Sequence, residues 1–322
     1  MPLVEIRDLI LEFGMGPHTV RAIDGVSLSL EAGETLCLVG ESGCGKSITA
    51  QSIARLVPSP PARYPQGAIF LNGQNVFELS NRELQEVRGG VVSYIFQEPS
   101  ACLNPVFRVG RQIKESLKLH RPETATDEEV IRLLKLVGIP APETRARDYP
   151  HQMSGGMQQR VMIAMALASE PKLLVADEPT TALDVTIQAQ ILQLLRELKQ
   201  RLNMSMLFIT HNLAIVGEIA DRVAVMYAGQ IVELASAQTL LANPRHPYTR
   251  ALLAAAPQLG SQQDRLLAIP GSVPLPGQTP KGCRFYPRCP NAPNHPECAE
   301  VAPELVEFQP GHWVRCLYAG EL

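Results

Sequence analysis

A glycine-rich stretch near the N-terminus, Gly40-Glu41-Ser42-Gly43-Cys44-Gly45-Lys46-Ser47, constrains the fold of this chain more than any other feature. It matches G-x-x-x-x-G-K-S, the pattern of a loop whose backbone N–H groups surround a chain of phosphates. The preceding residues 35–39 are apolar enough to form a buried strand, and residues 46–56 have the composition of a helix. This order of strand, loop and helix predicts an α/β fold, with Lys46 at the β- and γ-phosphates of a nucleotide and Ser47 as a ligand of Mg²⁺.

The length and composition of the chain agree with a globular protein of more than one domain. It has 322 residues, of which 45% are hydrophobic and 19% charged, and a formal net charge of −3. This charge gives no general reason to expect a nucleic-acid partner. No apolar run has the length of a membrane span, and the N-terminus lacks the charged and apolar regions of a signal peptide. We therefore expect a soluble, cytoplasmic chain whose association with a membrane depends on a partner.

Polar side chains follow three further stretches that we predict to be buried strands. Gln97 ends the first, the pair Asp177-Glu178 ends the second, and His211 follows the third. Ionised carboxylates at the end of a buried strand are costly unless they meet a cation or hydrogen-bond donors. We therefore expect Asp177 to have a Mg²⁺-linked role and Glu178 to orient or deprotonate a water molecule. His211 is a candidate for a γ-phosphate contact.

The segment 98–153 differs in character from the predicted strands around it. Residues 109–120 are predicted to form one helix, and a second begins at a capping box in which Thr126 and Glu129 cap each other. The segment is therefore expected to be a helical insertion in an α/β core. It is followed by Ser154-Gly155-Gly156-Met157-Gln158, which opens another helix; glycines before a helix N-terminus make either an anion site or a simple capped start.

The order of these motifs along the chain resembles that of the ATP-binding subunits of ABC transporters. The motifs that carry the resemblance are the phosphate loop, Gln97, the signature Ser154–Gln158, Asp177-Glu178, Ala182-Leu183-Asp184 and His211, and it covers roughly residues 3–256. It implies a P-loop ABC ATPase core with an antiparallel β subdomain at 1–97 and 154–240. It also implies a helical subdomain at 98–153 that couples to a membrane partner, with the signature at its end. A loop-rich C-terminal extension would occupy 241–322.

The resemblance further implies that two subunits pack head to tail with ATP between them. The residues expected at the ATP of the same subunit are Phe13, Gly40, Ser42, Gly43, Cys44, Gly45, Lys46, Ser47, Ile48, Gln97, Asp177, Glu178 and His211. Those expected at the ATP of the partner subunit are Ser154, Gly155, Gly156, Gln158 and Asp184.

Several of these positions have a specific role in the family. Phe13 resembles the aromatic that stacks on adenine, although by itself it could equally be a core aromatic on a strand. Ser47, Gln97 and Asp177 are the expected Mg²⁺ contacts. Glu178 is the expected catalytic base, acting with Lys46 and His211. Ile48 stands where many members carry threonine, so only its backbone N–H can serve a phosphate.

A separate group of cysteines lies in the proline-rich C-terminal segment. Cys283, Cys289, Cys298 and Cys316 follow the pattern C-x5-C-x8-C-x17-C. These thiols could ligate a [4Fe–4S] cluster or Zn²⁺, or neither; zinc sites usually contain closely spaced C-x2–4-C pairs, so the spacing favours the cluster. With Arg245-His246-Pro247-Tyr248-Thr249, the cysteines resemble the C-terminal extension of dipeptide and oligopeptide importer ATPases. That resemblance implies a [4Fe–4S] cluster, with a structural or regulatory role.

Taken together, the motifs predict an ATPase subunit that powers import of dipeptides or oligopeptides. The expected partners are a sister ATPase subunit in a heterodimer, two transmembrane permease subunits and a periplasmic or extracellular peptide-binding protein. The expected location is the cytoplasmic face of the inner (cell) membrane. The alternatives are an importer ATPase for nickel or another small solute, a soluble ABC ATPase that acts on DNA or the ribosome, and an iron–sulfur redox protein. The single cassette, without heptads or a basic patch, disfavours the second.

Overall fold

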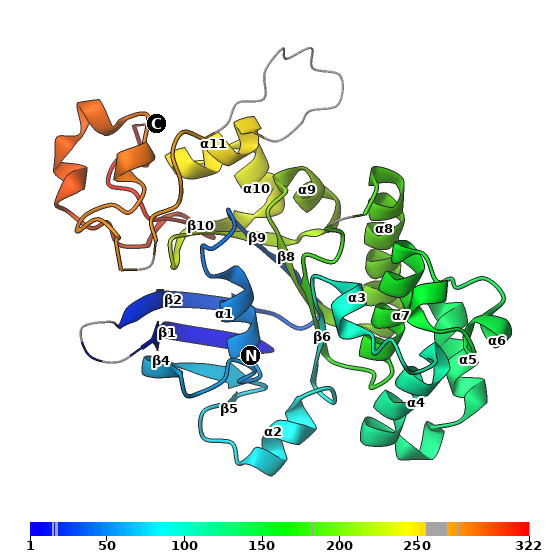
Figure 1. Cartoon of the computed structure of the whole chain (residues 1–322). Coiled ribbons are helices and arrows are strands. Elements are labelled where there is room, and N and C mark those ends of the chain that lie inside the picture. The colour runs from blue at the N-terminus through cyan, green and yellow to red at the C-terminus, as the bar shows by residue number, and fades with distance from the viewer. Residues whose placement is uncertain (15, 17–18, 182, 256–268, 276, 322) are drawn as a thin grey trace. The chain divides into compact units, whose positions relative to one another are not determined.

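The computed structural model describes residues 1–14, 16, 19–181, 183–255, 269–275 and 277–321 (Figure 1). These residues form two compact units, one of Met1–Glu78 with Ile209–Leu322 and one of Leu79–Phe208. Ala182 of the motif Ala182-Leu183-Asp184 lies outside the described residues.

The first unit begins with an antiparallel sheet in the order β2-β1-β4-β5. Its strands are β1 (Val4–Phe13), β2 (Val20–Leu30), β4 (Ala62–Leu71) and β5 (Gln74–Asn75). The branched residues of β1 are all buried, whereas its charged residues are more exposed, as expected of a sheet with one covered face. β4 begins within the proline-rich stretch 58–65, at Ala62, because β1 pairs with its whole length.

A second sheet of the first unit contains the strand that leads to the phosphate loop. Its strands are β3 (Thr35–Val39), β9 (Arg222–Tyr227), β10 (Gln230–Ser236), β12 (His312–Val314) and β11 (Val306–Gln309), neighbouring one another in this order. β3 is buried along its whole length and pairs with β9 in parallel. A hairpin at Ala228-Gly229 joins the antiparallel strands β9 and β10, and both residues have positive φ, 46° and 84°. The C-terminal extension adds β12 and β11 to this sheet.

Short helices complete the first unit. They are α1 (Lys46–Ser52), α9 (Val216–Ile219), α10 (Ala237–Ala242) and α11 (Pro247–Ala255). α1 ends at Ser52 and is shorter than the predicted helix 46–56. α11 begins at Pro247, where proline suits the first helical turn.

The second unit contains the neighbouring strands β6 (Val92–Ile95), β7 (Leu173–Asp177) and most of β8 (Ser205–Thr210). The last two residues of β8 belong to the first unit. β6 and β7 are parallel, so their carboxyl ends lie at one edge. Its helices are α2 (Asn81–Val87), α3 (Pro99–Cys102), α4 (Val109–His120), α5 (Asp127–Leu136), α6 (Pro142–Arg145), α7 (Gly155–Leu167) and α8 (Val185–Leu202). Helices α4 and α5 contact α7, the most buried of these helices.

The predicted capping box at the start of α5 is only half formed. Thr126 Oγ accepts the N–H of Glu129 at 3.2 Å, as expected. The Glu129 carboxylate instead binds Arg132 in a bidentate pair at 2.6 and 2.7 Å and lies 3.5 Å from Arg121. A nearby guanidinium is a stronger donor for a carboxylate than a backbone N–H.

These elements confirm the predicted fold class, an α/β ATPase core with an antiparallel subdomain, an inserted helical region and a loop-rich C-terminal extension. Within the described part of the chain, no helix combines the length and the apolar character needed to cross a bilayer.

Candidate functional site

The phosphate loop joins β3 to α1 in the first unit and has a geometry that only glycine permits at two positions. A Cβ on Gly40 would lie 2.2 Å from the carbonyl oxygen of Met226, closer than atoms can approach. Gly45 is the N-cap of α1 and has a φ of 109°, which side chains disfavour. Within the loop, Ser42 and Gly43 are exposed, whereas Cys44 is buried. The loop therefore presents backbone to solvent while its base is packed against β9.

Lys46 is almost completely buried and is held by the loop itself. Its Nζ donates to the carbonyl oxygens of Gly40 at 2.8 Å and Glu41 at 2.9 Å, and lies 3.8 Å from Cys44 Sγ. Burial raises the pKa of the Cys44 thiol, so this residue is a neutral filler of the loop. Ser47 and Ile48 follow in the first turn of α1 and are half-buried.

Two other predicted site residues belong to the same unit. Phe13 is the last residue of β1, is half-buried, and pairs with Val20 of β2 and Ala62 of β4. His211 is exposed and directly follows β8.

Glu178, the predicted base, occupies a strained position in the second unit. It directly follows β7 and has a φ of 47°, a left-handed conformation that costs energy for a residue with a Cβ. Its Oε2 accepts hydrogen bonds from Gln97 Nε2 at 3.2 Å and from Thr181 Oγ1 at 2.9 Å. The carboxylate is therefore oriented from two sides.

The structure brings Gln97 to Glu178 because both follow neighbouring parallel strands. β6 pairs in register with β7 from Val92 with Leu173 to Ile95 with Ala176, so the chain leaves both strands at one edge of the sheet. Asp177, the last residue of β7, is 7% exposed. Thr181 did not enter our predictions; the signal that could have revealed it is its spacing, three residues after a carboxylate in a turn.

The signature residues begin helix α7. Ser154 is the N-cap, and its Oγ accepts the N–H of Met157 at 3.4 Å. Gln158 donates its amide to the carbonyl oxygens of Pro150 at 2.9 Å and Met153 at 3.2 Å, which fixes the chain entering the helix. Ser154 and Gly155 are exposed, so the N-terminus of a thirteen-residue helix faces solvent.

Asp184 has the same arrangement at the start of α8. It is exposed and caps the helix by accepting the N–H of Ile187 at 3.0 Å. A Cβ on Gly156 would lie 2.9 Å from Ile187 Cγ2, and one on Gly155 3.7 Å from Leu183. The glycines of the signature therefore let α7 begin against the first turn of α8, which brings the signature and the Asp184 segment together.

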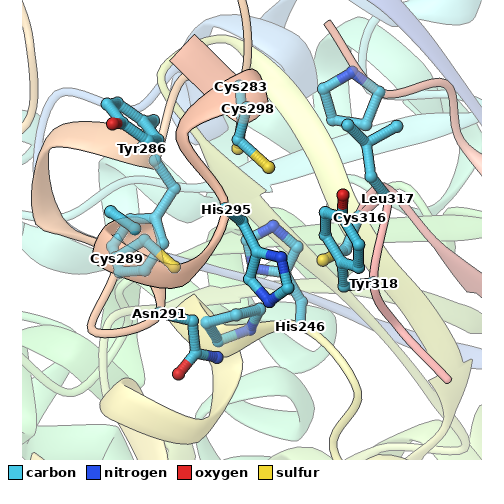
Figure 2. Close-up of a pocket in the computed structure, with 14 residues that line it drawn as sticks. His246, Cys283, Tyr286, Cys289, Asn291, His295, Cys298, Cys316, Leu317 and Tyr318 are labelled. Atoms are coloured by element: carbon cyan, nitrogen blue, oxygen red, sulfur yellow. The ribbon is translucent and has the colours of Figure 1, made fainter. Parts of the chain in front are cut away.

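The cysteines of the C-terminal extension converge on one cavity. Cys283, Cys289, Cys298 and Cys316 line it together with His246 and His295, and its volume is about 30 Å³ (Figure 2). Backbone hydrogen bonds hold the cysteines in place: the Cys283 N–H donates to Cys298 O at 2.8 Å, and the Cys289 N–H donates to Tyr286 O in a tight turn at 3.1 Å. We call this space the cysteine cavity.

The thiols of the cysteine cavity resist ionisation. Burial, and then the proximity of Cys283, Cys289 and Cys298, raises the pKa of Cys316 to about 12. Burial also raises the pKa of the other three thiols. A bound cation would reverse this by stabilising the thiolates, so the chemistry of the donor set suits a thiolate-ligated metal centre.

The geometry of the cysteine cavity, unlike the chemistry of its thiols, does not support a metal centre. Among the residues described, no group of three or more His, Cys, Asp or Glu side chains is placed to hold a metal ion. A volume of about 30 Å³ accommodates little more than one water molecule. In this arrangement the side chains do not fit a cluster, and they would have to rearrange to ligate one.

Comparisons with known proteins agree with the motifs. Residues 23–181 match the family described as ABC transporter, and residues 232–298 match the oligopeptide/dipeptide transporter C-terminal region. The chain is 51% identical over 286 residues to the oligopeptide transport ATP-binding protein OppD of Bacillus subtilis. This alignment covers 88% of this chain and 80% of that protein. It is 46% identical over 320 residues to the dipeptide transport ATP-binding protein DppD of Escherichia coli, covering 99% and 97%.

A solved structure has the same fold. A dimeric, post-hydrolysis ATP-binding cassette bound to ADP and Pi, MJ0796, matches with a TM-score of 0.64 and 26% identity, covering 73% of this chain and 98% of that one. The shared cassette, the family matches and full-length relatives at this level of identity establish the family and its ATPase activity. The chain therefore belongs to the ATP-binding, ATP-hydrolysing subunits of ABC transporters, in the group with an oligopeptide/dipeptide transporter C-terminal region.

Proposed function

We propose that this subunit powers the import of dipeptides or oligopeptides. The observation that carries the proposal is the segment 232–298, which matches the oligopeptide/dipeptide transporter C-terminal region. The names of the full-length relatives agree with it. The proposed partners are two transmembrane permease subunits, a peptide-binding protein outside the membrane and a sister ATPase subunit. The permease subunits would hold this chain at the cytoplasmic face of the cell membrane.

In the proposed ATP site, the phosphate loop binds the triphosphate. Its backbone N–H groups, with that of Ile48, donate to the phosphates, and Lys46 moves its Nζ from loop carbonyls to the β- and γ-phosphates. Ser47, Gln97 and Asp177 are the proposed contacts of Mg²⁺, which when bound offsets the charge of the phosphates. Phe13 is the proposed stacking partner of adenine.

Hydrolysis is proposed to proceed by in-line attack of water on the γ-phosphate. Glu178 accepts the proton of that water, and His211 contacts the γ-phosphate. The hydrogen bonds from Gln97 and Thr181 support this role, because they fix the direction of the Glu178 carboxylate before substrate arrives. The left-handed backbone at Glu178 supports it as well, since strain of this kind concentrates at active sites.

The signature is proposed to complete the ATP site of the partner subunit. Ser154, Gly155, Gly156 and Gln158 begin a long helix whose first N–H groups and exposed serine suit a γ-phosphate. Asp184 lies at the start of the adjacent helix, where it would contact the partner chain. A site shared in this way is complete only when two subunits close, so ATP binding and hydrolysis are coupled to movement.

The proposal divides the chain by role. The ATPase core comprises 1–97 and 154–240, the segment 98–153 transmits movement to the permease, and 241–322 is the C-terminal extension. In the extension we propose a [4Fe–4S] cluster at Cys283, Cys289, Cys298 and Cys316, with Zn²⁺ as the competing occupant. The proposal rests on the donor set, four thiols that line one cavity, and requires these side chains to rearrange around the bound group.

Uptake of a radiolabelled dipeptide into cells tests the proposed cargo. The chain is expressed with its permease, binding protein and sister ATPase in a host that lacks its own peptide importers. We expect ATP-dependent uptake with the wild-type chain and almost none with Glu178→Gln. Uptake of labelled nickel is measured in the same cells. Accumulation of nickel but not of peptide would refute the peptide assignment and leave the ATPase assignment intact.

A further inference from the structure

An arginine of the C-terminal extension binds the phosphate loop directly. Arg288 Nη1 lies 2.7 Å from Glu41 Oε2, and Nη2 lies 2.9 Å from Glu41 Oε1, a bidentate pair between residues 247 positions apart. The Arg288 side chain is only 5% exposed and that of Glu41 is 29% exposed. Pairs with this geometry are strong and directional, unlike most ion pairs on protein surfaces.

The neighbours of Arg288 hold its guanidinium in place. Nε donates to Pro270 O at 2.8 Å, and Nη1 lies 3.5 Å from the Tyr227 hydroxyl, with the guanidinium over the Tyr227 ring at 5.8 Å. The hydrogen bonds to Glu41 raise the pKa of Arg288, which keeps it charged. The side chain is therefore part of a built contact.

A second residue of the extension holds the main chain of Glu41. The hydroxyl of Tyr248, in α11, accepts the Glu41 N–H at 2.9 Å. Tyr248 is fully buried and its ring packs 4.6 Å from that of Tyr227. Glu41 is thus held at its backbone by one segment of the extension and at its carboxylate by another.

The contact places a compensated charge beside the phosphate-binding lysine. Glu41 O accepts Lys46 Nζ at 2.9 Å, so Glu41 is adjacent to that lysine. The Glu41 carboxylate puts a negative charge in a loop that is proposed to bind a triphosphate. Without Arg288 that charge would be uncompensated and would repel the phosphates.

We propose that Arg288 is a positioning residue for nucleotide binding, which neutralises the charge of Glu41 in the phosphate loop from the C-terminal extension. The inference rests on the proposed binding of ATP at this loop. It assigns the extension a part in the ATP site of its own subunit. Since Arg288 immediately precedes Cys289, it also links the cysteine cavity to the phosphate loop through one turn of chain.

Equilibrium binding of N-methylanthraniloyl-ATP with Mg²⁺ to the full-length chain tests the inference. We expect Arg288→Gln to weaken binding about tenfold, or about 1.4 kcal/mol, because the Glu41 carboxylate then faces the phosphates unpaired. The added variant Glu41→Gln in the same chain should restore the Kd to within about threefold of wild type. Glu41→Gln alone should leave the Kd equal or lower, because it frees a cation beside the phosphates. The increase in Kd caused by Arg288→Gln should be smaller at high salt, because salt screens the repulsion between Glu41 and the phosphates.

The matched control is Arg315→Gln. Arg315 also precedes a cysteine of the cavity, but it donates to Ile231 O and Pro303 O in the extension and the adjoining sheet. Arg315→Gln should leave the Kd unchanged.

Two results would overturn the proposal. One is a normal Kd in Arg288→Gln. The other is weaker binding in both Arg288→Gln and Glu41→Gln, which is expected if the pair between Arg288 and Glu41 has a purely structural role. Failure of the wild-type chain to bind the probe would instead refute ATP binding at the loop. If Arg288→Gln does not fold, the Kd of Glu41→Gln alone decides the question, because the proposal expects it to be equal to or lower than that of the wild type.

Discussion

Replacing Glu233 by Gln should loosen the C-terminal extension from the first unit. Glu233 lies in the middle of β10 and is fully buried. Its Oε1 accepts the N–H of Arg245 at 2.7 Å and lies 2.7 Å from His312 Nε2, while Oε2 accepts the N–H of His246 at 3.0 Å. One carboxylate thus joins β10, the segment that leads into α11, and β12.

The magnitude follows from these contacts. A glutamine with its oxygen at the Oε1 position keeps two of the bonds but turns an NH₂ group toward the N–H of His246. The lost bond to a charged acceptor costs about 1.5–3 kcal/mol, and the two donors left facing each other cost about 1–3 kcal/mol more. The sum is about 2.5–6 kcal/mol. In proteins of about 150–250 residues each kcal/mol lowers Tm by about 2–4 °C, so we expect a loss of about 5–24 °C.

Differential scanning fluorimetry of the purified chain at neutral pH measures this shift. The matched control is Glu307→Gln, because Glu307 lies in the same extension and accepts one backbone N–H, that of Gly311 at 2.8 Å, while exposed to solvent. It should shift Tm by about 1 °C or less. An equal Tm for Glu233→Gln and wild type would refute the reasoning that this buried carboxylate joins the extension to the sheet.

Three other outcomes are expected. Lys46→Ala should weaken binding of a fluorescent ATP analogue by at least about tenfold, because a charge-assisted contact to the phosphates is lost; unchanged affinity would contradict the assignment of the loop. Burial lowers the pKa of His246 from 6.5 to about 3. The unfolded chain therefore binds more protons between these values, so stability should fall as the pH drops from about 6.5 toward 3, and His246→Asn should flatten that dependence in urea titrations. Anaerobically purified protein should contain about four irons per chain, a loading typical of a [4Fe–4S] cluster; one zinc, or no metal, would contradict the cluster.

The phosphate loop could be predicted from the sequence because its signal is local. The glycines, Lys46 and Ser47 are consecutive, and the flanking strand and helix are visible in the same short stretch. The approach of Gln97 to Glu178 was also within reach, since side chains that follow two parallel strands meet at one edge. The strain at Glu178 was not, because backbone conformation at a single non-glycine residue has no pattern of its own.

The contacts of the C-terminal extension were beyond prediction for a different reason. β11 and β12 contain only four and three residues, too few for a period of two to be recognised. The pair Arg288–Glu41 depends on how distant segments pack, and neither residue type is unusual where it stands. The half-formed capping box at Thr126 has a local cause instead, since Arg132, one turn further along the same helix, binds the Glu129 carboxylate. Side-chain partners far apart in sequence need the structure.

Steady-state phosphate release by Glu178→Gln, measured beside its binding of N-methylanthraniloyl-ATP, tests the central claim most directly. If Glu178 is the base of a transport ATPase, the variant should bind the nucleotide with the affinity of the wild-type chain. Its turnover should nevertheless fall by about 10²–10⁴-fold, the usual contribution of a positioned general base. Turnover equal to that of the wild type would contradict the account. The Glu178 carboxylate, which Gln97 and Thr181 hold, would then have no part in hydrolysis.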